Sequence, residues 1–384
     1  MLCEKRPPEC EDVITGKRTH DARDLPAHEK GYDTCFLHVP KPDGDFYDPD
    51  RQGIARFLPV LPIRDIPFSL GEGNTPLIQS KVFAQLFIKN EGMNPTGSFK
   101  DRESALALAY AHEQGWDDLA IASSGNAALS AAFYARIYGI RMTCYVPRRT
   151  SKTKVQMIEM FGGHAHKVGE SYEETYRYLL ENLPSGVHNM TSGVFSLRCE
   201  GAKTIAYEVW QQMHGVPDAV LCCAGNGSAF ASIYHGFAEL KRWGLAEKIP
   251  VMICVQVQGG DPINQAFESG KWVTVLKNVP ESECEAIVAN ESYCSAKAIH
   301  AMRESGGFGI SVTDDQVIDG LRYAIDREGI FPEFSSASVF AAFLENSKRI
   351  SALGKNILLI NTGSGLKEIA LLQKALHRNG DREP

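Results

Sequence analysis

The chain has 384 residues, of which 43% are hydrophobic and 23% are charged; this composition is typical of soluble globular proteins, and the length predicts about two domains. A net charge of −7 and a pI near 5.9 exclude the basic surface that nucleic-acid binding requires. No apolar run is long enough to span a membrane, and the N-terminus is charged from Glu4 onward, so neither a transmembrane helix nor a signal peptide is expected.

Residues 1–67 are expected to form an N-terminal arm or lobe, because their start is rich in Pro, Asp and Lys and shows little periodicity. The ten cysteines of the chain are scattered, which predicts a reduced, cytoplasmic protein. Cys3, Cys10 and Cys35 lack the close pairing, with roughly two to four intervening residues, of structural zinc sites. We therefore expect no bound metal.

The stretch "NEGMNPTGSFKDR" at 90–102 predicts a turn followed by a helix. Ser98 and Asp101 have the spacing of a capping box ahead of an apolar run, which places Lys100 at the second helical position. The positive end of the helix dipole disfavours a cation there, and burial would disfavour it further. A neutral amine can form an imine with a carbonyl-bearing ligand. The alternative is an exposed lysine that the helix start merely tolerates.

The rest of the chain repeats one pattern, a short apolar run followed by a polar turn and a helical stretch. The pattern covers residues 119–139, 141–163, 164–183, 219–244, 251–270 and 356–378. Strands that alternate with helices predict an α/β fold with parallel sheets covered on both faces. Such sheets bind ligands at the carboxyl ends of their strands, where the polar turns lie.

Three of these turns carry groups suited to a ligand. The loop "AGNGSAF" at 224–230 lies between a predicted strand and a helix start, where backbone N–H groups favour a phosphate. The turns "SSGN" at 123–126 and "NTGSG" at 361–365 offer polar groups at similar positions. Each signal is ambiguous alone, since such turns also serve only as tight connections or caps. A lysine, a phosphate loop and two polar turns together indicate pyridoxal 5′-phosphate, an aldehyde that carries a phosphate.

The order of these motifs resembles one family. "EGNTPL" at 72–77, the lysine stretch, "SSGN", "AGNGS" and "NTGSGLKE" follow one another as in threonine synthases, a family of the tryptophan-synthase-like, fold type II group of pyridoxal-phosphate enzymes. "CVQVQGG" at 254–260 and "EGIFPEFSSAS" at 328–338 echo two further segments of that family. The resemblance covers residues 68–375. It disfavours the alternative in which Lys100 is only an exposed lysine at a helix start.

The resemblance implies a fold of two lobes, each with a helix-flanked, mostly parallel sheet. Residues 68–106 and 190–384 would form a large lobe that binds the cofactor, and residues 107–189 a small mobile lobe inserted in it. Members of the family are commonly dimers, so a homodimer is implied as well. The only other partner expected is a small amino-acid substrate.

The resemblance also assigns roles to individual residues. The implied cofactor-binding residues are Lys100 at the aldehyde, Phe99 against the ring, Asn126 at the phenolic oxygen, Thr362 at the pyridine nitrogen, and Gly225, Asn226, Gly227, Ser228 and Ala229 around the phosphate. The implied substrate-binding residues are Ser123, Ser124 and Ala127 on the carboxylate side and Arg198 at the phosphate. Lys100 is also the implied catalytic acid and base.

The reaction that the resemblance implies is the conversion of O-phospho-L-homoserine and water to L-threonine and phosphate. Thr362 offers a neutral hydroxyl to the pyridine nitrogen, which suits elimination and replacement more than transamination. Ala127 departs from the family, which commonly has threonine there, and Phe195 and Ser196 replace its asparagine and proline. The alternative is therefore β-replacement or elimination on another amino acid, as in a cysteate-synthase-like or natural-product biosynthetic enzyme. A third reading, a catalytically inactive regulatory protein, is opposed by the retained lysine and phosphate loop.

Overall fold

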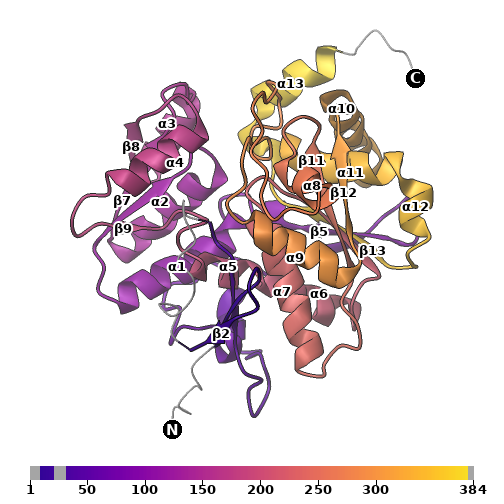
Figure 1. Cartoon of the computed structure of the whole chain (residues 1–384), viewed down its shortest axis with the longest axis horizontal. Coiled ribbons are helices and arrows are strands. Elements are labelled where there is room, and N and C mark those ends of the chain that lie inside the picture. The colour runs from indigo at the N-terminus through magenta and orange to yellow at the C-terminus, as the bar shows by residue number, and fades with distance from the viewer. Residues whose placement is uncertain (1–8, 21–31, 379–384) are drawn as a thin grey trace. The chain divides into compact units, whose positions relative to one another are not determined.

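The computed structural model describes residues 9–20 and 32–378. Contacts divide the chain into two compact units: unit 1 is Met1–Asn74 with Lys100–Thr204, and unit 2 is Thr75–Phe99 with Ile205–Pro384. Figure 1 shows their helices and strands along the chain. The three-part division into residues 1–67, 68–106 with 190–384, and 107–189 remains a prediction. In the described part of the chain, no helix has the length and apolar character needed to cross a membrane.

Unit 1 contains a four-stranded parallel sheet in the order β8-β7-β6-β9. Its strands are β6 (Asp118–Ala122), β7 (Arg141–Val146), β8 (His164–Lys167) and β9 (His188–Asn189). Its helices are α1 (Lys100–Glu113), α2 (Asn126–Tyr138), α3 (Lys152–Met160), α4 (Tyr172–Glu181) and α5 (Leu197–Ala202). The last four residues of β6 are all buried, as expected for a parallel strand covered on both faces.

The N-terminal part of unit 1 is more regular than its sequence predicts. A three-stranded antiparallel sheet joins β1 (Glu9–Asp12), β2 (Arg18–Thr19) and β3 (Cys35–His38), and a 3₁₀ helix, η3, covers Gly53–Val60. These strands are rich in charged side chains and lack the apolar alternation that would predict them. Glu11 of β1 makes polar contacts with one residue of β2 and one residue of β3. Glu11 Oε2 lies 2.8 Å from Arg18 Nη2 and 2.6 Å from His38 Nε2.

The cysteines considered for zinc are placed as follows. Cys10 lies in β1 opposite Leu37, and Cys35 lies in β3 opposite Asp12. Cys3 falls outside the described residues. Within residues 9–20 and 32–378, no group of three or more His, Cys, Asp or Glu side chains is arranged to hold a metal ion.

Unit 2 is built on a six-stranded sheet in the order β12-β11-β10-β13-β5-β4, parallel except for β4, which is antiparallel to β5. Its strands are β4 (Leu77–Gln79), β5 (Leu86–Asn90), β10 (Ala219–Cys223), β11 (Val251–Val257), β12 (Phe308–Val312) and β13 (Ile357–Asn361). Its helices are α6 (Thr204–Met213), α7 (Ser228–Arg242), α8 (Pro262–Glu268), α9 (Ser295–Ser305), α10 (Asp314–Tyr323), α11 (Phe334–Glu345), α12 (Ser347–Ser351) and α13 (Ile369–Arg378), with short turns at η4 (Glu91–Met93), η5 (Ala324–Glu328) and η6 (Gly365–Lys367).

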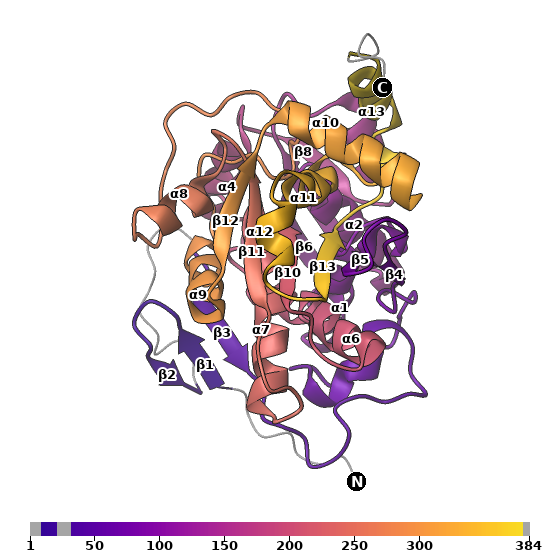
Figure 2. The same ribbon diagram turned by 90° about the vertical axis from the view of Figure 1, so that its right-hand side faces the viewer.

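Helices cover both faces of the six-stranded sheet (Figure 2). Ala219, Leu221 and Cys223 of β10 share one buried core with helix α11. Helices α7 and α9, which contribute nothing to that core, pack together on β10 and β11 from the other face. Cys222 is buried but is absent from the α11 core, as the alternation of side chains along a strand requires. The expected α/β fold with helix-flanked, mostly parallel sheets is confirmed.

Helix α5 approaches helix α1 more closely than any side chain at Gly201 would allow. A Cβ atom built on Gly201 would lie 2.1 Å from the carbonyl oxygen of Arg102. Arg102 in turn donates from Nη1 to Thr204 Oγ1 at 3.0 Å, just after α5. The glycine therefore permits backbone contact between the two helices, and this contact brings the α5 side chains to the start of α1.

Gly201→Ala should destabilise the protein by about 1–3 kcal/mol, because the added methyl group must push α5 away from the α1 backbone. Gly215→Ala is the matched control, since a Cβ atom there meets nothing within 4 Å. The urea midpoint of unfolding, followed by circular dichroism, measures both changes. Equal midpoints for the two variants would contradict the close packing at Gly201.

Candidate active site

The position of Lys100 is set by the two residues before it. Ser98 pairs with Gly363 in an antiparallel bridge, and the Phe99 N–H donates to the Thr362 carbonyl at 3.1 Å. Phe99 is buried. Helix α1 begins at Lys100 and not, as predicted, one residue earlier, because the Ser98–Phe99 backbone is engaged by the segment after β13. The lysine therefore starts its helix directly behind the carboxyl end of β13.

The predicted phosphate loop connects β10 to helix α7. Gly227 has φ +89°, a left-handed conformation that side chains rarely adopt. A Cβ atom on Gly225 would lie 2.4 Å from the Ala286 carbonyl oxygen. Both glycines are thus needed for the turn. Ser228 and Ala229 are the first residues of the 15-residue helix α7, whose leading N–H groups have no acceptor inside the helix. These donors and the helix dipole suit a phosphate.

A second segment, missed by sequence reasoning, holds the phosphate loop from outside. Asn226 Oδ1 accepts from the Tyr293 N–H at 2.6 Å, and the Asn226 carbonyl accepts from the Cys294 N–H at 3.0 Å. Ser292 Oγ donates to the Gly225 carbonyl at 2.6 Å. The side chain of Asn226 is therefore used to fix the loop. Residues 292–294 have no periodic pattern and precede helix α9, so the sequence offered no signal for this role.

Thr362 lies at the end of β13, next to the end of β10. Its hydroxyl oxygen is 2.5 Å from Ser336 Oγ and 3.4 Å from Cys223 Sγ. Burial raises the pKa of the Cys223 thiol to about 12, so this neighbour is uncharged at neutral pH. The Ser336 hydroxyl and the Cys223 thiol that contact Thr362 are therefore neutral. The contact of Thr362 with a pyridine nitrogen stays a prediction.

Two observations within unit 2 fit the cofactor expected from the sequence. The turn at Gly225 and Gly227 has backbone geometry that only glycine accommodates, as a loop close to a phosphate requires. Ser98 Oγ is buried and has no hydrogen-bond partner among the described residues. A buried hydroxyl without a hydrogen bond lowers the stability of the folded protein. The Ser98 hydroxyl therefore indicates a polar group that a ligand would supply.

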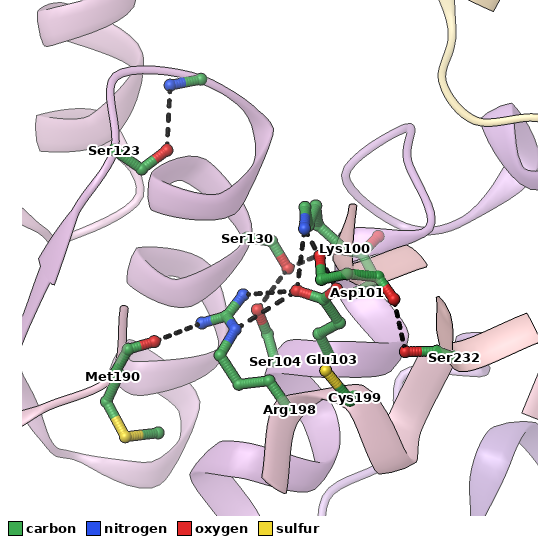
Figure 3. Close-up of polar contacts among 12 residues, drawn as sticks. Lys100, Asp101, Glu103, Ser104, Ser123, Ser130, Met190, Arg198, Cys199 and Ser232 are labelled. Carbon is green, nitrogen blue, oxygen red and sulfur yellow. Dashed lines mark hydrogen bonds and ion pairs between the residues drawn. The ribbon is translucent and has the colours of Figure 1, made fainter. Parts of the chain in front are cut away.

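The side chain of Lys100 lies in a cluster of charges within unit 1 (Figure 3). Its Nζ atom donates to both oxygens of Glu103 at 3.0 Å. Arg198 donates to Glu103 Oε2 from Nε at 3.2 Å and from Nη2 at 3.1 Å. Glu103 is fully buried and Arg198 is 1% exposed, whereas Lys100 is 15% exposed.

Glu103 was missed by the sequence reasoning, although its spacing was readable. Residues three apart on a helix lie on the same face, and an acidic residue three positions after a lysine forms an ion pair. The Glu103 carboxylate favours an ammonium at Lys100 and so opposes the effect of the helix dipole. The structure also engages the Arg198 guanidinium inside the protein, through Glu103 and the Met190 carbonyl at 3.3 Å.

The "SSGN" turn links β6 to helix α2. The Ser123 N–H donates to the Tyr145 carbonyl of β7 at 3.0 Å, and the Ser123 hydroxyl accepts from the Gly125 N–H at 3.3 Å. Gly125 is the N-cap of α2, and Asn126 is its first residue. Residues 123–127 are all partly exposed, so Ser124, Asn126 and Ala127 can be reached by a small molecule.

Phe195, one of the departures from the family pattern, belongs to an aromatic cluster of unit 1. Its ring centroid lies 5.8 Å from that of Tyr110 and 6.0 Å from that of Trp116. Trp116 stacks on His188 with centroids 3.8 Å apart. The phenylalanine therefore contributes packing where the family has a polar side chain.

Comparisons with known proteins agree with this geometry. Residues 68–363 match the model of a family described as pyridoxal-phosphate dependent enzyme. The threonine synthase of Methanocaldococcus jannaschii is 31% identical over 82% of this chain and 81% of its own length, and that of Methanosarcina acetivorans is 31% identical over 82% and 80%.

Solved structures show the same fold at lower identity. An L-serine ammonia-lyase from Rhizomucor miehei matches with a TM-score of 0.69 and 19% identity over 80% of this chain and 98% of that one. A threonine deaminase from Solanum lycopersicum matches with a TM-score of 0.67 and 19% identity over 80% and 88%. The expected fold type II architecture and the pyridoxal 5′-phosphate cofactor are thereby confirmed. The chain belongs to the family of pyridoxal-phosphate-dependent enzymes, and within that family it is threonine-synthase-like.

Proposed function

We propose that this enzyme converts O-phospho-L-homoserine and water to L-threonine and phosphate. The observation that carries the proposal is the anchoring of Phe99 to Thr362, which starts helix α1 at Lys100 directly behind the carboxyl end of β13. The similarity to curated threonine synthases over more than four-fifths of the chain supports the substrate.

The roles of the residues follow from their chemistry. Bound pyridoxal 5′-phosphate supplies an electron sink that acidifies the α-proton of an attached amino acid. Lys100 would hold the cofactor at its aldehyde, and its Nζ atom would accept the α-proton of the bound amino acid. The Gly225–Ala229 loop binds the cofactor phosphate through N–H groups, and Phe99 packs on the ring. Thr362 contacts the pyridine nitrogen through its hydroxyl.

The substrate side is assigned to unit 1. Asn126 donates to the phenolic oxygen of the cofactor, and Ser123 and Ser124 with the backbone at Ala127 bind the substrate carboxylate. Arg198 binds the substrate phosphate through its guanidinium, which can offer parallel donors. We also propose a cytoplasmic homodimer, as the family resemblance implies; light scattering on the purified protein measures the number of subunits.

A second candidate function is favoured by one specific observation. Arg198 is 1% exposed and already donates to Glu103 through two nitrogen atoms. An arginine held in this way has fewer donors for a substrate phosphate. β-Replacement or elimination on another amino acid, phosphorylated or not, as in a cysteate-synthase-like or natural-product enzyme, is therefore the alternative.

Lys100 is predicted to carry the cofactor. Borohydride reduction of the purified yellow protein, followed by peptide mapping, should place the pyridoxyl mass on the peptide that contains Lys100. Lys100→Ala should abolish the label, whereas Lys152→Ala, a change at an exposed lysine, should keep it. A label on any other lysine would overturn the assignment.

The phosphate loop is predicted to act mainly through its backbone. Gly227→Val should reduce cofactor retention more than Ser228→Ala, because valine rarely adopts φ +89° and its Cβ atom would lie 3.1 Å from Ile263 Cδ1. A hydroxyl bond to a charged group contributes only ~1.5–3 kcal/mol. Titration of each cofactor-free variant with pyridoxal 5′-phosphate measures the difference, and parental affinity in both would remove the loop from the site.

The substrate is tested by a panel of phosphorylated and unphosphorylated amino acids, with phosphate release and amino-acid product measured together. Arg198→Ala should lower catalytic efficiency on O-phospho-L-homoserine roughly ten- to hundredfold, the loss of one charge-assisted contact, while the cofactor spectrum stays intact. Ala127→Thr should raise that efficiency. Arg141→Ala is the control, because this arginine is 75% exposed.

The panel also decides between the two candidate functions. Turnover of another amino acid, together with no turnover of O-phospho-L-homoserine and no effect of Arg198→Ala on the active substrate, would establish the alternative. Phosphate release with threonine as the product would establish the threonine synthase reaction.

A further inference from the structure

The start of helix α11 is joined by its backbone to the segment that follows β13. The Glu333 N–H donates to the Gly363 carbonyl at 3.0 Å, and Pro332 pairs with Ser364 in an antiparallel bridge. A Cβ atom on Gly363 would lie 2.4 Å from Glu333 Cδ, so no side chain fits there. These residues belong to unit 2, in which α11 packs on β10 and β13 (Figure 2). The backbone therefore fixes the first turn of α11 beside Thr362.

Ser336 is the third residue of α11 and is fully buried. Its hydroxyl oxygen accepts from the Gly363 N–H at 2.9 Å and lies 2.5 Å from Thr362 Oγ1. Among the described residues, these two are the hydrogen-bond partners of the Ser336 hydroxyl. A serine hydroxyl carries one proton, and a buried proton of this kind needs an acceptor. Because an N–H group cannot accept, the Ser336 proton points to Thr362 Oγ1.

The direction of this bond decides what the Thr362 hydroxyl offers to a ligand. The bond from Ser336 occupies a lone pair of Thr362 Oγ1, so Thr362 keeps its own proton for another acceptor. Its other described neighbour is Cys223 Sγ at 3.4 Å, and a thiol sulfur is a weak acceptor. The ring nitrogen of a pyridine accepts more strongly than this sulfur. The Thr362 proton is therefore available to a ring nitrogen.

We propose that Ser336 is a positioning residue that donates to Thr362 and so directs the Thr362 proton at the ring nitrogen of the cofactor. The inference deepens the proposed function and rests on the proposed contact between Thr362 and that nitrogen, but not on the identity of the substrate. The Gly363 N–H, the Ser336 hydroxyl and the Thr362 hydroxyl form a chain of donors in one direction, and each bond polarises the next. The chain favours a ring nitrogen that carries no proton.

The first test measures the affinity of the full-length, cofactor-free protein for pyridoxal 5′-phosphate by fluorescence titration. Ser336→Ala should weaken binding roughly three- to tenfold, the range of one hydrogen bond, because Thr362 loses the group that orients it. Thr362→Val should weaken binding at least as much, because it removes the donor itself. The double variant should match Thr362→Val within about twofold, because Ser336 acts through Thr362. Ser335→Ala, at the neighbouring buried serine, should match the parent.

The second test separates this role from a purely structural one. Its probe is the analogue of pyridoxal 5′-phosphate in which C–H replaces the ring nitrogen and cannot accept a hydrogen bond. Ser336→Ala should change the affinity for this analogue by less than about twofold, whereas a general loss of structure would weaken both ligands equally. If Ser336→Ala fails to fold, Ser336→Cys keeps the size of the side chain with a weaker donor, and it should show the same difference between the two ligands.

The direction of the bond is measured by NMR on the parent protein, loaded with pyridoxal 5′-phosphate that carries nitrogen-15 in its ring. The nitrogen should carry no proton at neutral pH, because a nitrogen that accepts from Thr362 has its lone pair free of a proton. A protonated ring nitrogen would show that Thr362 accepts, which overturns the proposal.

The affinities give distinct outcomes. Weaker binding in Ser336→Ala that disappears in the Thr362→Val background and with the analogue establishes the proposal. Parental affinity in Ser336→Ala, additive losses in the double variant, or equal losses on both ligands overturn it and leave the contact between Thr362 and the ring nitrogen in place. Parental affinity in Thr362→Val removes that contact and this inference with it. Turnover of O-phospho-L-homoserine affects none of these results.

Discussion

The hydrogen bond from the Phe99 N–H to the Thr362 carbonyl is the constraint on which the rest of the site depends. It joins Phe99 to Thr362, the residue that follows β13, and both residues belong to unit 2. The neighbouring strand β10 leads into the phosphate loop from the same edge. One backbone contact thus joins two segments of unit 2 that lie more than 260 residues apart in the sequence.

The balance of charge around Lys100 is the second determinant of the chemistry. The helix dipole alone would disfavour an ammonium at the first position of α1. The Glu103 carboxylate opposes this effect, because Lys100 Nζ donates to it at 3.0 Å. Arg198 is a second cation on the same carboxylate.

The departures from the threonine synthase pattern belong to unit 1, whereas the residues that we propose for the cofactor phosphate belong to unit 2. Phe195 joins the aromatic cluster of Tyr110 and Trp116, and Ala127 leaves a small side chain at the start of α2. Gly225, Gly227 and Thr362 keep the family motifs in unit 2.

The sequence by itself determined the α/β fold, the cofactor class and the candidate lysine, because these depend on local signals. The signals are strand–turn–helix periodicity, glycines in the turn between a strand and a helix, and a lysine next to a helix start. It did not indicate the antiparallel N-terminal sheet, whose strands are rich in charged residues, or the Ser292–Cys294 segment that supports Asn226. The sequence also predicted that Arg198 binds the substrate, but it did not predict that Arg198 pairs with Glu103. Only the tertiary structure decided that pair, because it requires α5 to touch α1 at Gly201, and contacts between elements 95 residues apart leave no periodic trace in the chain.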